Sequence, residues 1–108
     1  MNWIILQSEG DVDEAINLSK EKTVVFFKHS TRCPVSAMAK RKLERDWNYS
    51  GDEVYTFFLD LIRYRQVSNY IEKITGIPHE SPQLIAVKNE KVIYHDSHHH
   101  IRTNFLST

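Results

Sequence analysis

Residues 26–36 read FFKHSTRCPVS, and this stretch decides how the chain folds and where its chemistry lies. An apolar run typical of a buried strand ends at Phe27, a short polar loop follows, and a helical pattern begins at Pro34. Proline is favoured at the first position of a helix, because its missing N–H has no intrahelical partner there. The stretch therefore predicts a strand, a loop and a helix that starts directly after Cys33.

Cys33 is the single cysteine of the chain, and the predicted helix places its thiol at a helix N-terminus. The unpaired N–H groups of Val35 and Ser36 can point at the sulfur there, and the helix dipole and Arg32 add positive charge. Such surroundings favour the thiolate, which is the attacking species in thiol–disulfide exchange. We therefore expect a reactive cysteine. The alternative is a small buried apolar residue, the usual fate of a lone cysteine.

Ser36 stands where a C-x-x-C dithiol motif carries its second sulfur. A serine can hydrogen-bond a neighbouring thiolate, but it forms no disulfide. The motif CPVS of residues 33–36 should therefore stop at a mixed disulfide and need an external thiol to complete turnover. Taken alone the motif is a weak signal, because a polar residue in the first turn of a helix is common.

Outward from this motif, strand-like and helix-like patterns alternate along the chain. The predicted strands cover residues 3–6, 23–27, 54–59, 83–88 and 92–96. The predicted helices begin near residue 8 and at residues 34, 64 and 99, and the last three end near residues 47, 75 and 106. Val35, Met38 and Leu43 should face the core, as should Ile74, and Gly76 is a candidate left-handed cap. This order predicts one α/β domain over residues 1–108, with an antiparallel hairpin at the sheet edge.

Composition excludes several classes of function. The 108 residues are 41% hydrophobic and 26% charged, with a formal net charge of zero. A neutral chain gives no reason to expect nucleic acid or an anionic membrane as a partner. No segment is long enough to span a membrane, and the first apolar stretch is too short for a signal peptide. A single cysteine suits a reducing compartment, so we expect a cytoplasmic protein.

Two further positions are candidates for substrate binding. Pro82 follows Ser81 and precedes a predicted strand; a cis bond there would expose the backbone of Ser81 for pairing with an extended substrate. The alternative is an ordinary trans proline at the start of a strand. Lys28, five residues before Cys33, could bind the carboxylate of a small thiol, or it could be a solvated lysine at a strand end.

The histidines predict no metal site. His98, His99 and His100 are adjacent, so on a helix they point in different directions and share no ligand face. An exposed polar turn is the simpler interpretation. His79 lacks the second histidine of a zinc-protease helix, and His29 is either a surface residue or an aid to proton transfer.

The CPVS motif, the Ser81-Pro82 pair and the element order together resemble the thioredoxin fold, a three-layer sandwich with a central mixed sheet of four to five strands flanked by helices. More closely, the chain resembles the YtxJ-type monothiol bacilliredoxins. Residues 27–36 and 76–83 carry this resemblance, which covers nearly the whole chain.

The resemblance implies a cytoplasmic enzyme of low-GC Gram-positive bacteria that acts in redox homeostasis under oxidative stress. Such an enzyme removes bacillithiol, a cysteinyl sugar thiol, from modified client proteins, and it needs no metal or bound cofactor. Cys33 would be the nucleophile of the catalytic motif with Pro34 and Ser36, and Pro82 the cis-proline that shapes the substrate groove. Arg32, where family members can have threonine, would alter client preference.

Three other functions stay open at this point. The chain could be a thioredoxin-fold adaptor that binds peptides without redox turnover. It could bind an iron–sulfur cluster between two copies, each supplying Cys33, as some monothiol glutaredoxins do. It could also reduce another substrate, such as a peroxide or an arsenate.

Overall fold

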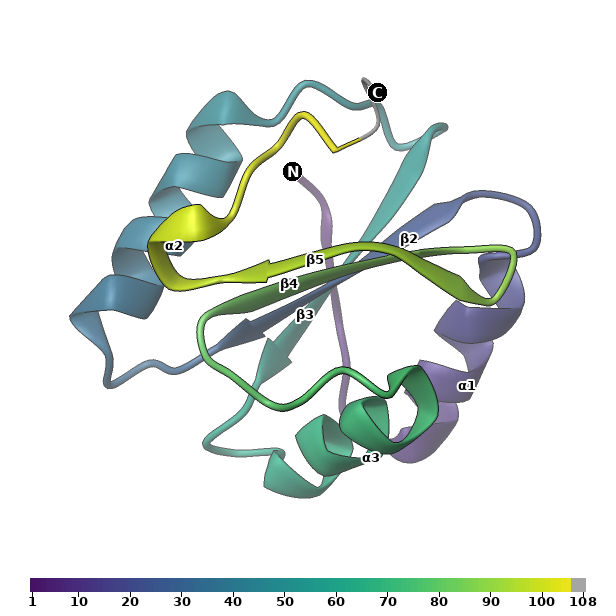
Figure 1. The fold of residues 1–108 in the computed structure, drawn as a ribbon, viewed down its shortest axis with the longest axis horizontal. Coiled ribbons are helices and arrows are strands. Elements are labelled where there is room, and N and C mark those ends of the chain that lie inside the picture. Colours follow the sequence, from purple (N-terminus) through teal and green to yellow (C-terminus); the bar gives the residue numbers. More distant parts are fainter. Residues whose placement is uncertain (106–108) are drawn as a thin grey trace.

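The structure is a computed structural model that describes residues 1–105. These residues form one α/β domain, in which a five-stranded sheet carries helices on both faces (Figure 1). The elements are β1 (Trp3–Ile5), α1 (Glu9–Leu18), β2 (Thr23–His29), α2 (Pro34–Asp46), β3 (Val54–Asp60), α3 (Arg65–Thr75), β4 (Gln83–Lys88), β5 (Lys91–Ser97) and the 3₁₀ turn η1 (His98–His100).

The sheet is mixed, as the sequence predicts. Its strand order is β1-β3-β2-β4-β5, with β1, β3 and β2 parallel, β4 antiparallel to β2, and β5 antiparallel to β4. The hairpin turns through Asn89 and Glu90, whose φ angles are 53° and 64°. Two consecutive left-handed residues are the signature of a tight hairpin turn that matches the twist of its strands.

The central strand β2 is buried on both faces, which explains its uninterrupted apolar sequence. Val24 and Phe26 belong to the core beneath α1 and α3, and Val25 and Phe27 to the core beneath α2. The strand runs two residues further than predicted, through Lys28 and His29. Because side chains alternate along a strand, Lys28 continues toward α3 and His29 toward α2.

Helix α3 ends as predicted, whereas the inner faces of α2 and α3 differ from the prediction. Gly76 has a φ of 74° and closes α3 by donating its N–H to the carbonyl of Glu72 over 2.9 Å. In α2, Ser36 and Leu43 are buried, whereas the side chain of Met38 is 56% exposed. Ile74 is likewise exposed, so helical spacing alone misplaced these two apolar residues.

The helix expected over residues 99–106 does not form in the described part of the chain, and its last residue lies outside that part. A 3₁₀ turn is followed by irregular chain that begins extended at Ile101, and the N–H of Arg102 donates to the hydroxyl of Tyr94 over 3.0 Å. That N–H is therefore engaged with a strand residue instead of a helical carbonyl. Ile101 and Phe105 still pack into the core beneath α2, so the apolar spacing was informative and the helix assignment was wrong.

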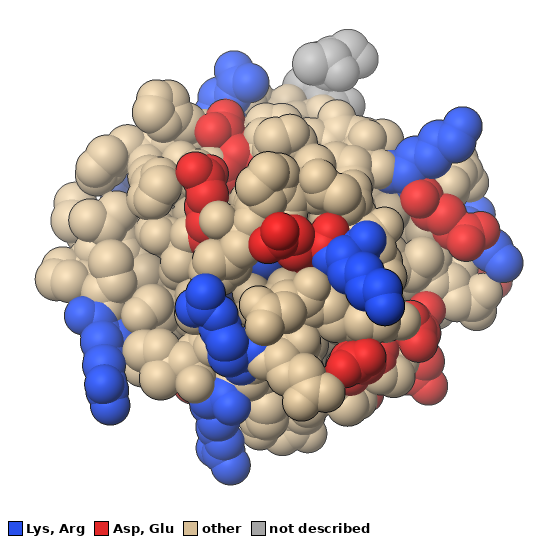
Figure 2. Space-filling model, turned by 60° about the horizontal axis from the view of Figure 1, so that its bottom comes forward, with Lys and Arg blue, Asp and Glu red and all other residues tan. Residues whose placement is uncertain are grey.

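The surface carries both signs of charge. Figure 2 shows a face on which Lys and Arg side chains lie among Asp and Glu side chains, with uncharged surface between them. Within residues 1–105, no helix has the length and apolar character needed to cross a membrane.

Candidate active site

Cys33 is the N-cap of α2, directly before Pro34, as the sequence predicts. Its φ and ψ angles of −109° and 117° are extended, and its carbonyl accepts the N–H of Ala37 over 3.1 Å. The residue is partly exposed, and it is a free cysteine. One expected detail is wrong: the sulfur accepts no capping hydrogen bond from the described first turn of α2.

The described hydrogen bonds of Ser36 go to residues other than Cys33, although the sequence allowed its hydroxyl to bond the neighbouring sulfur. Its side chain is completely buried, and its Oγ lies 2.7 Å from Nδ1 of His29. The same oxygen accepts the N–H of Ser30 over 3.1 Å. Ser36 therefore fastens the loop before Cys33 to the end of β2.

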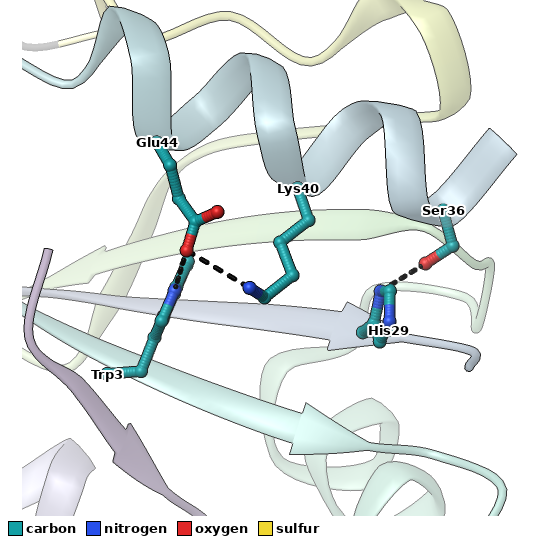
Figure 3. Close-up of polar contacts among 5 residues, drawn as sticks. All are labelled: Trp3, His29, Ser36, Lys40 and Glu44. Carbon is teal, nitrogen blue, oxygen red and sulfur yellow. Dashed lines mark hydrogen bonds and ion pairs between the residues drawn. The ribbon is translucent and has the colours of Figure 1, made fainter. Parts of the chain in front are cut away.

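A row of polar side chains follows Ser36 along the face of α2 that covers the sheet (Figure 3). Lys40 and Glu44 are spaced one turn apart, and the Glu44 carboxylate accepts hydrogen bonds from the Trp3 indole over 2.9 Å and from the Lys40 ammonium over 3.0 Å. The Trp3 hydrogen bond, followed by Lys40, lowers the pKa of Glu44. The row thus joins α2 to the edge strand β1.

His29 lies beneath this row and is an interior histidine, in contrast to the surface residue considered from the sequence. Burial is the main cause that lowers its pKa from the ordinary value of 6.5, and the positive charge of Lys40 adds to the effect. A neutral imidazole accepts at one nitrogen. Because Ser30 already donates to Ser36, the pair is satisfied when the Ser36 hydroxyl donates to Nδ1 of His29.

Lys28 is also an interior residue, which corrects both of its sequence interpretations. The side chain is completely buried, so its ammonium meets neither solvent nor the carboxylate of a ligand in this conformation. The Nζ atom lies 3.3 Å from the carbonyl of Ser68 and 3.4 Å from Nδ1 of His79. Burial lowers the pKa of Lys28 to about 8; Glu72 acts in the opposite direction and Arg65 in the same one.

His79, which is half-buried, completes this cluster, and no sequence pattern indicated this role. Its Nδ1 also lies 2.9 Å from the hydroxyl of Ser68, and its backbone N–H donates to Glu72 over 3.0 Å. Burial, then Lys28, lowers the pKa of His79. Since an ammonium can only donate, Nδ1 of His79 accepts. The cluster therefore connects β2 and α3 to the loop that leads into Pro82.

The peptide bond between Ser81 and Pro82 is cis, the conformation that the substrate-binding prediction required. Pro82 is buried, and the Oγ atom of Ser81 is buried with no hydrogen-bond partner among the described residues. The carbonyl of Pro82 accepts the N–H of His98 over 2.9 Å. The cis-proline loop is thus joined to the turn that follows β5.

The sheet register brings the candidate residues to one end of the molecule. Lys28 pairs with Gln83 and Gln83 with Ser97, so the end of β2, the start of β4 and the end of β5 lie side by side. The loop to Cys33 and the Ser81-Pro82 pair begin there. Arg32 is exposed on the loop, whereas Lys28, four residues earlier, is buried in the interior.

The three histidines of η1 are exposed at this same end. In residues 1–105, no group of three or more His, Cys, Asp or Glu side chains is arranged to hold a metal ion. The arrangement instead offers one accessible thiol at a helix start, at the same end of the molecule as the cis-proline loop. This geometry can carry out thiol exchange with an extended partner.

A family model for monothiol bacilliredoxin BrxC matches residues 4–106. The chain belongs to the monothiol bacilliredoxin family. Membership agrees with the resemblance seen in the CPVS motif and in the Ser81-Pro82 segment. Together with the fold, it supports a redox role for this bacilliredoxin-family chain.

Solved structures agree on the fold of this bacilliredoxin-family chain. A protein described as a candidate oxidoreductase with a thioredoxin fold is 30% identical, with a TM-score of 0.78 over 97% of this chain and 90% of that one. Thioredoxin from Malassezia sympodialis is 20% identical, with a TM-score of 0.71 over 99% and 85%. Thioredoxin O2 from Arabidopsis thaliana is 18% identical, with a TM-score of 0.67 over 97% and 88%. The last two likenesses show the thioredoxin fold alone.

Proposed function

We propose that this protein is a monothiol thiol–disulfide oxidoreductase that removes bacillithiol from protein mixed disulfides through Cys33. The observation that carries the proposal is the difference in exposure between Cys33 and Ser36, which lie in the same turn at the start of α2. Cys33 is partly exposed at the N-cap of α2, whereas Ser36, in the place of a second thiol, is completely buried. The chain therefore has one sulfur with which to accept an adduct.

The first step is attack by the Cys33 thiolate on the bacillithiol sulfur of the client's mixed disulfide. A new disulfide forms between Cys33 and bacillithiol, the old S–S bond breaks, and the client thiolate leaves with the electron pair. In the second step, the thiolate of a free bacillithiol attacks the adduct. Cys33 leaves as a thiolate, and bacillithiol disulfide is released.

Residues around the thiol bind the client, and the proposed reaction needs no metal or bound cofactor. The backbone of Ser81, next to the cis Pro82, pairs with the extended client chain. Arg32 contacts the client from the exposed loop. Lys28 contributes to client binding indirectly, because it belongs to the interior cluster that holds the loop before Pro82. We place this reaction in the cytoplasm, where bacillithiol-modified proteins are the partners.

The test is to mix the reduced protein with a bacillithiol-modified client and to follow the intact masses of both over time. Bacillithiol should leave the client and appear on Cys33 as one adduct, and added bacillithiol should then remove it. Cys33→Ala should abolish the transfer, whereas Ser36→Ala should retain it once folding has been verified by circular dichroism. Full transfer by Cys33→Ala would refute the proposal.

A result with no transfer at neutral pH, but with retained binding of the client, would favour the adaptor function instead. An iron–sulfur protein would be coloured on purification, and cluster loss in Cys33→Ala would identify Cys33 as the ligand. Turnover of a peroxide or an arsenate without transfer of bacillithiol would assign the thiol to another substrate.

A further inference from the structure

A groove of about 380 Å³ runs between α2 and the segment that follows β5. Its volume lies within the range of about 300–1,000 Å³ that ligand sites occupy. The groove lies where residues 101–105 form irregular chain and the sequence predicted a helix. Neither the fold family nor the thiol chemistry accounts for it.

The groove begins at the proposed site. Val35, two residues after Cys33, lines it, and so does His98, whose N–H is bonded to the carbonyl of Pro82. His98 has a φ of 55°, a left-handed conformation that turns the chain from β5 toward α2. A polypeptide bound at Cys33 and Ser81 can therefore continue into the groove without leaving the surface.

The floor of the groove is apolar. Ala39, Leu43 and Ile101 line it, and Leu43 and Ile101 are almost completely buried. Met38, whose side chain is 56% exposed, stands at the edge. An exposed methionine is adaptable and suits contact with varied apolar side chains.

The rim of the groove is basic, and none of its lining residues carries a carboxylate. Arg41, Lys42 and Arg45 lie along α2, and His98 and His99 face them from η1. Arg45 already pairs with Asp46 over 3.0 Å, whereas Arg41 and Lys42 make no ion pair within residues 1–105.

This local excess of positive charge stands out because the whole chain is neutral. Complementary charge raises association rates and selects partners more than it raises affinity. We infer that the groove binds an acidic segment of the client polypeptide, close to the modified cysteine, with Arg41 and Lys42 meeting its carboxylates. The inference rests on the proposed function, and it makes the protein selective for clients whose modified cysteine has acidic neighbours.

The test uses two synthetic peptides that carry the same bacillithiol mixed disulfide and differ only in three flanking residues, glutamate in one and glutamine in the other. The wild type should transfer from the glutamate peptide with a kcat/KM about three- to tenfold higher at low salt. The preference should disappear near 1 M salt, where the screening length is about 3 Å. It should also disappear in the double variant Arg41→Gln, Lys42→Gln.

A matched control removes the same charge elsewhere. Lys73 and Lys88 are exposed and do not line the groove, so Lys73→Gln, Lys88→Gln should keep the preference. Equal kcat/KM for both peptides in the wild type would overturn the inference and leave the proposed function intact. An equal fall in kcat/KM for both peptides in the groove variant, Arg41→Gln with Lys42→Gln, would assign the groove to the small thiol. That result too would overturn the inference.

A second readout separates the two proposals if no transfer occurs. Cys33→Ser lacks the nucleophile, and binding of fluorescent versions of both unmodified peptides to it can be measured by anisotropy. Tighter binding of the glutamate peptide, lost in the groove variant, supports the acidic docking surface without reference to turnover. Equal binding of both peptides contradicts it.

Discussion

The Oγ atom of Ser36 lies 2.7 Å from Nδ1 of His29, in the interior between α2 and the end of β2. The same oxygen accepts the N–H of Ser30, so one hydroxyl serves the strand end and the loop that leads to Cys33. In a dithiol motif the residue at this position would be a second cysteine. Here it is a structural hydrogen-bonding residue that holds the loop before the reactive thiol.

Ser36→Ala should destabilise the protein without removing its exchange chemistry. The change leaves the N–H of Ser30 and the Nδ1 of His29 without their partner, which costs about 1–3 kcal/mol for a buried group. Urea unfolding followed by circular dichroism measures the loss. Ser50→Ala, at an exposed serine, is the matched control and should change stability little. Equal effects of the two variants would contradict the structural role of Ser36.

Ser36→Cys should convert the protein into a dithiol enzyme. After transfer, the new thiol can attack the adduct on Cys33 and release bacillithiol, which leaves an internal disulfide. Intact-mass measurement should show the adduct at early times and a loss of two hydrogens at the end, with no added thiol. A persistent adduct in this variant would show that position 36 cannot reach the sulfur of Cys33.

The free energy of unfolding should fall as the pH drops below about 6.5. The pKa of His29 and that of His79 are lowered in the folded protein, chiefly by burial, so the unfolded chain binds more protons in the window below the ordinary value of 6.5. Stability then rises with pH across this window and is fully present above it. Urea unfolding between pH 5 and 7 measures the slope, which should be smaller in His29→Asn. A wild-type profile without slope would contradict the prediction.

The buried Lys28 should make the free energy of unfolding increase a second time, between about pH 8 and pH 10. The pKa of its ammonium is lowered to about 8 from 10.5, mainly by burial, so between these values the unfolded chain holds a proton that the folded chain has released. Stability therefore increases with pH across this window. Lys28→Met removes the titrating group, and the wild type should gain stability relative to this variant from pH 8 to pH 10. A constant difference in unfolding free energy would contradict the burial of the charge.

The elements that could be predicted from the sequence are those with strong local signals. Pro34 and Gly76 mark the start of one helix and the end of another, because each residue suits a backbone position that few others tolerate. The apolar run at the start of β2 marks the central strand. The CPVS motif and the Ser81-Pro82 segment identified the fold and the family together.

What could not be predicted depends on tertiary contacts between polar groups. From the sequence, Lys28 was a solvated or ligand-binding residue at a strand end and His29 a loop residue. Both instead continue β2 into the interior, where Ser68, His79 and Ser36 supply their partners. A lysine carries no sequence mark of such partners. In the same way, the N–H of Arg102 bonds to Tyr94, and a segment with helical spacing becomes irregular chain.

The buried hydroxyl of Ser36 makes the protein usable as a record of its own turnover. Dithiol exchange enzymes clear their adduct by internal attack, so the adduct is retained only when one sulfur is engineered away. Here the bacillithiol adduct left on Cys33 has no internal route to resolution. In a preparation depleted of small thiols, the unaltered protein should therefore keep one bacillithiol for each client it has reduced, and a reductant releases it for counting.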